Sequence, residues 1–114
     1  AAEGAKIACP CNLALPDSQG ALKTFYDSYR REIGKDPGLY SPEGYDAAKI
    51  LIQAIKEGNR DRASILRYIE DIDRFEGASK TIEFEPNGNL VRRQFFVFEV
   101  KGGKIAPHQT VNVG

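Results

Sequence analysis

Two cysteines with one proline between them, Cys9 and Cys11 around Pro10, are the residues most suited to chemistry. Their spacing could suit a metal ion, a redox-active pair or a small-ring disulfide. A structural zinc site takes four ligands and no partner ligands lie nearby, so we expect no metal. Redox pairs are more often separated by two residues. In an extended segment both side chains point to one face, so a mutual disulfide and two separate thiols both stay open.

His108 is the single histidine, so only one imidazole is available for acid or base catalysis. It follows Pro107 in a polar tail, and we expect a solvated residue because no element would hold it in place. The acids Glu70, Asp71 and Asp73 have the spacing of a solvated helix face rather than of a paired general acid and base. The sequence therefore predicts that the chain is not an enzyme.

Three further patterns could bind anions or nucleic acid, and each has a structural explanation. The Arg92–Arg93 pair suits the exposed face of an edge strand, where charge discourages edge-to-edge pairing. The Gly102–Lys104 segment lacks the preceding glycine and following Ser or Thr of a phosphate loop. Phenylalanines at Phe95, Phe96 and Phe98 could stack bases, but their position within a strand favours packing.

The 114 residues are 41% hydrophobic with 16 basic and 16 acidic side chains, which is typical of one soluble domain. Balanced charge gives no electrostatic reason to expect nucleic acid or an anionic membrane as a partner. No apolar run approaches the ~20 residues that span a bilayer. The chain contains no methionine, so we interpret it as a mature or cut-down piece of a longer protein, with any export signal upstream.

Hydrophobic periodicity predicts three helices. The first is capped by Asp17 and stops at Gly34, and the second is capped by Ser41 and stops at Gly58. The third covers about residues 61–73. The second helix has its polar residues in one narrow stripe, so we expect neighbouring structure to cover it on several sides.

About three strands are expected. Residues 6–9 form a short strand, and residues 81–85 pair with residues 93–101 in a hairpin around the Asn87–Gly88 turn. A turn at Gly102–Gly103 follows. Three helices need a sheet of several strands to pack on, so this α/β sheet is incomplete on its own. We expect the chain to associate with itself or with a missing portion.

Four blocks carry a family resemblance: Tyr40–Ala48, Phe75–Gly77, Ile82–Asn89 and Phe95–Lys104. In this order and at these separations they resemble the C-terminal part of the branched-chain amino-acid binding proteins that serve bacterial ABC importers. The resemblance runs from about residue 2 to residue 107. It covers nearly all of this chain but only about the last third of a family member.

The resemblance implies a type I fold of two α/β lobes joined by crossing segments. Residues 1–13 then look like one crossing strand, residues 14–90 like part of one lobe, and residues 91–114 like another crossing strand and a tail. Short crossings of this kind absorb hinge motion when a ligand closes the cleft. The residues expected in the two crossings are Cys9, Pro10, Cys11 and Asn12, and Phe95, Phe96 and Val97.

Tyr40 matches a family position whose aromatic side chain lines the cleft and covers the ligand. It lies in a loop between Gly38 and Pro42, where its ring can project from a fixed scaffold. The alternative is a tyrosine that packs against the neighbouring loop. The resemblance also implies an oxidising extracytoplasmic compartment, either the periplasm or a lipid-anchored position at the cell surface, where Cys9 and Cys11 could be oxidised.

The implied function is solute capture for an ABC transporter, with an amino acid of the branched-chain type or a related small acid as ligand. The implied partners are this small molecule and the membrane permease, and no cofactor is expected. A ligand-sensing module of a receptor or regulator with the same bilobal fold is the alternative.

Overall fold

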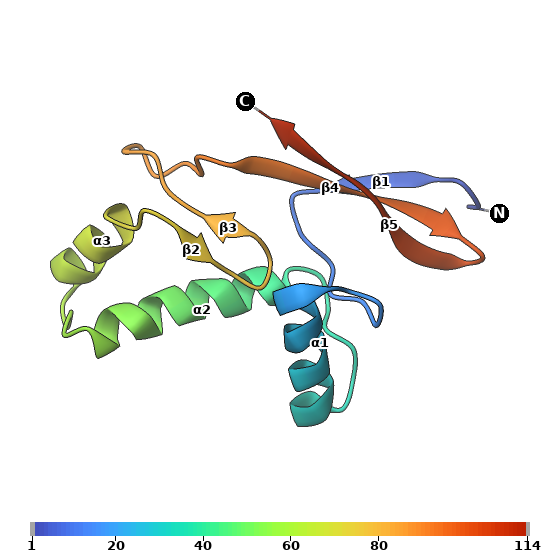
Figure 1. Cartoon of the computed structure of the whole chain (residues 1–114). Helices are drawn as coiled ribbons and strands as arrows, with labels where there is room; N and C mark the ends of the chain where they lie inside the picture. The colour runs from blue at the N-terminus through green and yellow to red at the C-terminus, as the bar shows by residue number, and fades with distance from the viewer. Residues whose placement is uncertain (1, 114) are drawn as a thin grey trace.

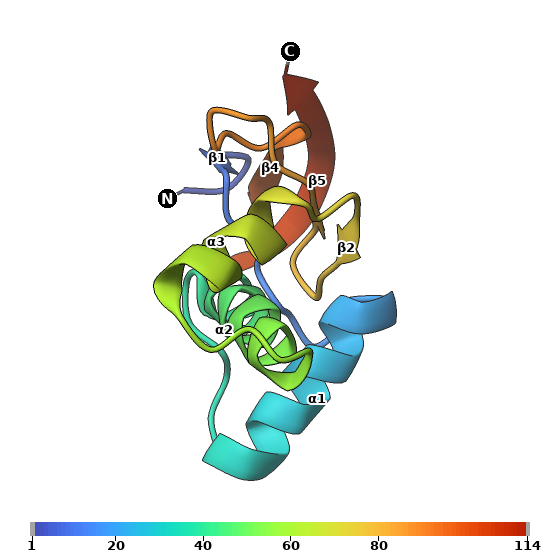
Figure 2. The same cartoon turned by 90° about the vertical axis from the view of Figure 1, so that its left-hand side faces the viewer.

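The computed structural model describes residues 2–113. Its elements are β1 (Lys6–Cys9), α1 (Gly20–Ile33), α2 (Ser41–Lys56), α3 (Arg62–Glu70), β2 (Phe75–Glu76), β3 (Thr81–Ile82), β4 (Arg93–Lys101) and β5 (Lys104–Val113). Figure 1 and Figure 2 both show α1 and α2 on one side of the molecule and the strands β1, β4 and β5 on the other. The Cα radius of gyration is 16.0 Å, against about 13 Å for a compact domain of this length, so the chain is open and elongated.

The main sheet is antiparallel, in the order β1-β4-β5. Cys9 pairs with Phe96, so the sheet places the two predicted crossing segments side by side. The β4–β5 hairpin turns at Gly102 and Gly103, which both have the positive φ that a tight two-residue turn requires. The predicted turn at this position is confirmed.

The expected hairpin between residues 81–85 and 93–101 is wrong. Instead β3 pairs with β2, and a single bridge between Phe84 and Leu90 closes the Asn87–Gly88 turn. The physical reason is that both edges of β4 are occupied, one by β1 and the other by β5. Alternation within a strand indicates which face is buried but not which strand is the partner.

The helix ends follow local rules with three corrections. α1 starts after Gln19, so the cap expected at Asp17 is wrong, whereas Gly34 ends this helix with φ 81° as predicted. The N-cap of α2 is Tyr40 rather than Ser41. α3 ends at Glu70, short of residue 73; Asp61 caps it, accepting a hydrogen bond of 2.9 Å from the Ser64 N–H.

His108 lies in β5 and not in a loose polar tail, which corrects the expectation for this residue. Its Nδ1 atom is 3.3 Å from Oε2 of Glu99 on the neighbouring strand. The polar composition after Pro107 suggested a tail, but β5 is an edge strand that stays exposed along most of its length, so polar residues can pair there. None of the described helices combines the length and apolar character needed to cross a membrane.

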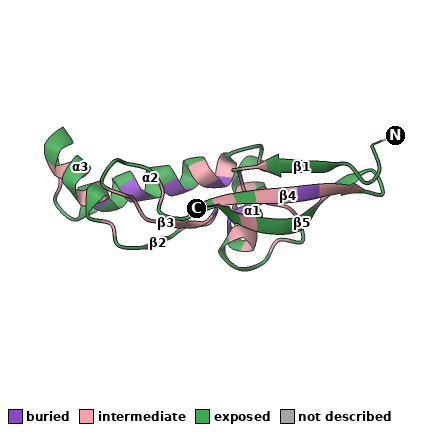
Figure 3. Cartoon of the chain, turned by 90° about the horizontal axis from the view of Figure 1, so that it is seen from above, coloured by how far each residue is buried: buried purple, intermediate pink, exposed green. Residues whose placement is uncertain are grey.

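Buried apolar residues are few, and their one cluster lies where α1 meets the loop before it. The small core consists of Ala14, Phe25 and Tyr26, with Leu22, Tyr29 and Ala78 packed against it. Figure 3 shows that exposed residues run along much of α2, β1 and β5. The expectation that α2 is covered on several sides is therefore not met within this chain, because Leu51, Ile52 and Ile55 are 44–51% exposed.

Candidate functional site

Tyr40 stands at the N-terminus of α2 in a left-handed backbone conformation, with φ 61° and ψ 8°. Among residues 2–113 every other positive φ belongs to a glycine. A non-glycine residue in this region costs about 1–2 kcal/mol because its Cβ crowds the backbone. The residue in this conformation nevertheless carries a large aromatic ring, which is half exposed. Backbone strain of this kind is concentrated at functional positions.

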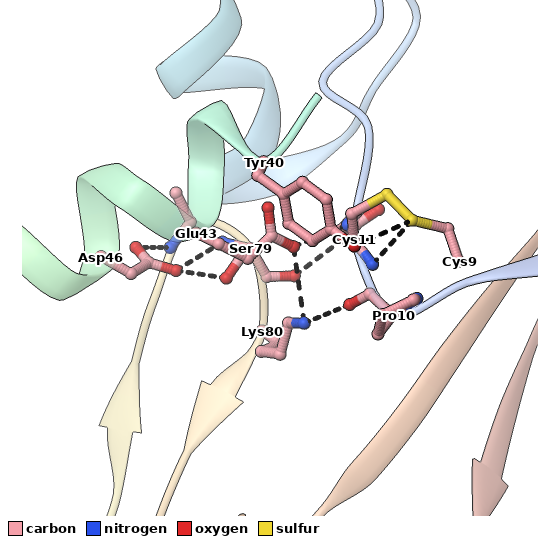
Figure 4. Close-up of polar contacts among 10 residues, drawn as sticks. Cys9, Pro10, Cys11, Tyr40, Glu43, Asp46, Ser79 and Lys80 are labelled. Atoms are coloured by element: carbon pink, nitrogen blue, oxygen red, sulfur yellow. Dashed lines mark hydrogen bonds and ion pairs between the residues drawn. A yellow bond between two sulfur atoms is a disulfide. The ribbon is translucent and has the colours of Figure 1, made fainter. Parts of the chain in front are cut away.

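The Tyr40 side chain extends towards the crossing segment (Figure 4). Its hydroxyl lies 4.0 Å from Sγ of Cys9. In the structure Cys9 and Cys11 are joined by a disulfide with a Cα separation of 5.0 Å, and the Cys11 N–H donates to Sγ of Cys9 at 3.1 Å. Cys11 is fully buried. The predicted ligand residue and the predicted crossing segment thus form one local arrangement.

A partly buried ion pair lies beside this arrangement (Figure 4). Nζ of Lys80 is 3.4 Å from Oε1 of Glu43 and donates to the Pro10 carbonyl oxygen at 2.5 Å. The same Glu43 oxygen accepts a hydrogen bond of 2.6 Å from the Asn12 N–H. Nζ of Lys80 also lies 5.4 Å from the centroid of the Phe96 ring, within range of a cation–π contact.

The loop that carries Lys80 is fixed by Asp46 on α2. The Asp46 carboxylate is fully buried and accepts hydrogen bonds from the N–H groups of Ala78 and Ser79, at 2.7 and 2.8 Å, and from the Ser79 hydroxyl at 2.5 Å. Gly77 allows this approach, because a Cβ there would lie 2.8 Å from the Lys80 carbonyl oxygen and closer still to the Asp46 carboxylate. The turn between β2 and β3 is thus held against α2.

The structure brings most of the predicted site residues together. Cys9, Pro10, Cys11 and Asn12 lie beside Tyr40, and Phe96 lies opposite Cys9 in the sheet. Phe95 and Val97 alternate with Phe96 along β4 and so point to its other face. Glu43, Asp46, Ser79 and Lys80 were not singled out from the sequence. Glu43 and Asp46 are three residues apart on α2 and so are neighbours on its surface, which is the local signal that could have linked these two.

A hollow of about 440 Å³ lies elsewhere, between α1, α2 and the β2–β3 turn. Aromatic side chains including Phe25, Tyr29 and Tyr45 line it, and Tyr40 does not. This hollow therefore does not coincide with the predicted ligand position at Tyr40. A cleft between two lobes needs a wall from each lobe, so this chain is not expected to enclose one by itself.

Comparison with known proteins identifies the family. A family model described as periplasmic binding protein matches residues 2–104. The chain belongs to this family. No protein among the curated ones is similar enough to count as a relative. The family consists of binding proteins, in agreement with the prediction that the chain is not an enzyme.

Solved structures of ABC transporter substrate-binding proteins share the fold. A leucine-binding protein from Thermotoga maritima is 28% identical with a TM-score of 0.77, and the match covers 97% of this chain and 31% of that one. A substrate-binding protein from Desulfitobacterium hafniense, in complex with Leu, is 23% identical with a TM-score of 0.78, covering 94% and 32%. A solute-binding protein from R. palustris, in complex with benzoate, is 18% identical with a TM-score of 0.74, covering 98% and 31%.

The chain spans about a third of the length of these structures. Its three helices and incomplete sheets match part of a type I periplasmic binding protein fold, which confirms the predicted fold class. The assignment of residues to crossings and lobe, and the role of Tyr40, stay predictions.

Proposed function

We propose that the full-length protein captures a small solute outside the cytoplasm and delivers it to the permease of an ABC importer. Membership of the periplasmic binding protein family supports this function. The solved structures that share the fold are described as ABC transporter substrate-binding or solute-binding proteins. In this proposal the described residues supply part of one lobe and two of the segments that cross to the other lobe.

The proposed ligand is an amino acid of the branched-chain type or a related small carboxylate. Leucine and benzoate, the ligands in two of the similar structures, both combine a carboxylate with an apolar body. A half-exposed aromatic ring is suited to cover such an apolar body. Tyr40 is the residue proposed for this contact, and groups outside this chain would bind the carboxylate.

The observation that carries the proposal is the strained backbone of Tyr40 beside the crossing segment. A glycine would adopt this conformation without strain, and the half-exposed ring is not part of the hydrophobic core. A ring held in a costly conformation at the N-terminus of a helix, within reach of a hinge segment, is best explained by contact with a ligand.

Calorimetry on the full-length protein tests the proposal. Titration with L-leucine, L-isoleucine, L-valine and benzoate should give saturable one-to-one binding of at least one of them. D-leucine is the matched control for the amino acids, since it has the same composition and hydrophobicity with inverted geometry. Absence of binding by all four carboxylates would contradict the proposed ligand class.

A further inference from the structure

Lys80 and Glu43 connect segments that are far apart in the sequence. Lys80 lies in the β2–β3 turn and donates to the Pro10 carbonyl oxygen, which is 70 residues away. Glu43 in the first turn of α2 accepts from the Asn12 N–H, 31 residues away. Asn12 in turn donates through Nδ2 to the Ser79 carbonyl oxygen at 2.7 Å. One ammonium group and one carboxylate oxygen thus tie the segment 10–12 to both α2 and the β2–β3 turn.

This ion pair differs from the others in its burial. The side chains of Lys80 and Glu43 are 8% and 20% exposed, whereas those of Lys23 and Asp27, paired along α1, are 40% and 58% exposed. An exposed pair adds little to stability. A partly buried pair costs desolvation that offsets much of its attraction, so it contributes defined geometry more than stability.

The pair is also connected to Tyr40 through the start of α2 and through the crossing segment. Tyr40 is the N-cap of α2 and Glu43 lies in its first turn, three residues further on, so both side chains are attached to one helix. Pro10 lies between Cys9 and Cys11, and Sγ of Cys9 is 4.0 Å from the Tyr40 hydroxyl. The position of the crossing segment and the position of the Tyr40 ring are therefore fixed together.

We propose that Lys80 and Glu43 are positioning residues for the ligand cleft, which hold both crossing segments against the helix that carries Tyr40. Contact with Phe96 on β4 extends this hold to the second crossing. Loss of the pair frees the crossings, so the lobes close less completely on a ligand. The proposal rests on the proposed function, because it assigns a role in the same cleft.

The test uses the full-length protein with single and combined variants of the pair and one control variant. Lys80→Met keeps the apolar stem and removes the ammonium, and Glu43→Gln keeps an acceptor for the Asn12 N–H and removes the charge. Lys23→Met is the matched control, since it removes the same group from the exposed pair with Asp27. Binding of L-leucine and benzoate is measured by calorimetry, and small-angle X-ray scattering with and without these probes reports the opening of the lobes.

Lys80→Met should weaken binding about ten-fold and should leave the scattering at saturating probe closer to the open form, whereas Lys23→Met should stay within about two-fold. Combining Lys80→Met with Glu43→Gln should cost about as much as Lys80→Met alone, because the two groups act through one contact. Lys80→Arg should restore closure in part. If Lys80→Met does not fold, the affinity and scattering of Lys80→Arg are compared with those of the wild type instead.

Equal affinity and equal scattering in wild type and Lys80→Met would overturn the positioning role. A lower melting temperature with unchanged affinity and lobe opening would equally overturn it, since that result describes a structural pair only. Failure of the wild type to bind any probe would count against the proposed function instead. Scattering of the ligand-free variants would then still decide the positioning role, which requires a more open ensemble in Lys80→Met.

Discussion

The carboxylate of Asp46 accepts hydrogen bonds from both the N–H and the hydroxyl of Ser79, 33 residues further along the chain. Both residues are buried, and together they fix the β2–β3 turn on α2. The pair is the most deeply enclosed polar contact among the described residues. Because these hydrogen bonds satisfy the Asp46 carboxylate, a charged residue can occupy a buried helix position.

Asp46→Ala should destabilise the full-length protein by about 3 kcal/mol or more, because three buried donors lose their acceptor. Asp46→Asn should cost less, since its carbonyl oxygen still accepts while its amide group opposes a donor. Chemical denaturation followed by circular dichroism measures both. Asp27→Ala, which removes a carboxylate from an exposed pair, is the control and should stay within about 0.5 kcal/mol. Similar losses in Asp27→Ala and Asp46→Ala would contradict this account.

The isolated 114-residue chain should associate. Leu51, Ile52 and Ile55 on α2 are 44–51% exposed, and their helical spacing makes them neighbours in an apolar surface with no cover in this chain. Contiguous apolar surface of this kind drives association of a soluble protein. Light scattering during size-exclusion chromatography should report oligomers or aggregates. A compact monomer with a cooperative melt would refute the expectation.

Lysine substitution of this surface provides a matched test. Ile52→Lys should reduce association of the isolated chain, because a buried charge opposes contact between apolar faces. The same change at an exposed position outside this surface, Thr24→Lys on α1, should leave association unchanged. If the two variants associate to the same extent, the contact between chains lies outside this apolar surface.

The conformational preferences of single residues predicted several turns and helix ends. They did not predict which strands pair with each other. Gly34 and the Gly102–Gly103 turn were placed correctly because a left-handed backbone is a property of the residue itself. The partner of residues 81–85 was wrong, because competition for the edges of β4 depends on β1, more than 70 residues earlier. The cap at Tyr40 could not be predicted, since tyrosine has no intrinsic preference for positive φ.

The candidate site was predicted where a resemblance or an unusual spacing marked a residue. Tyr40 and the segment from Cys9 to Asn12 were named, and the structure places them together. Lys80 was missed because nothing in its neighbourhood distinguishes a buried lysine from a solvated one. Its partner atoms belong to Pro10 and Glu43, which are 70 and 37 residues away, so only the folded chain shows the contact.

Cys9 and Cys11 should be oxidised in protein recovered from the periplasm or the medium. Oxidising compartments preserve disulfides, and the Cα separation of 5.0 Å suits a bond between the two side chains. Mass spectrometry after alkylation without reductant should find no label on either cysteine. The same sample reduced with dithiothreitol before alkylation is the control and should carry two labels. Two labels without reductant would show free thiols.

Substitution of Tyr40 in the full-length protein separates strain from ligand contact. Tyr40→Asn removes the ring and keeps a residue that tolerates the left-handed conformation, so stability should stay the same or rise by about 1 kcal/mol. Ligand binding should weaken by about 3 kcal/mol, since an aromatic ring can bury on the order of 150 Å² at about 25 cal/mol per Å². A gain in stability together with a loss in affinity is the result that a packing role cannot give.

Tyr40→Phe then distinguishes two ways in which the ring could act. A small loss of affinity for L-leucine or benzoate would mean that the ring covers the apolar body of the ligand, and a large loss would mean that the hydroxyl makes a hydrogen bond. Tyr29→Phe on α1 is the control, because this ring packs against Phe25, away from Tyr40. Calorimetry and thermal melts on the same samples give both quantities. Unchanged affinity in Tyr40→Asn would assign Tyr40 to loop packing and would leave the strain at φ 61° without a ligand to explain it.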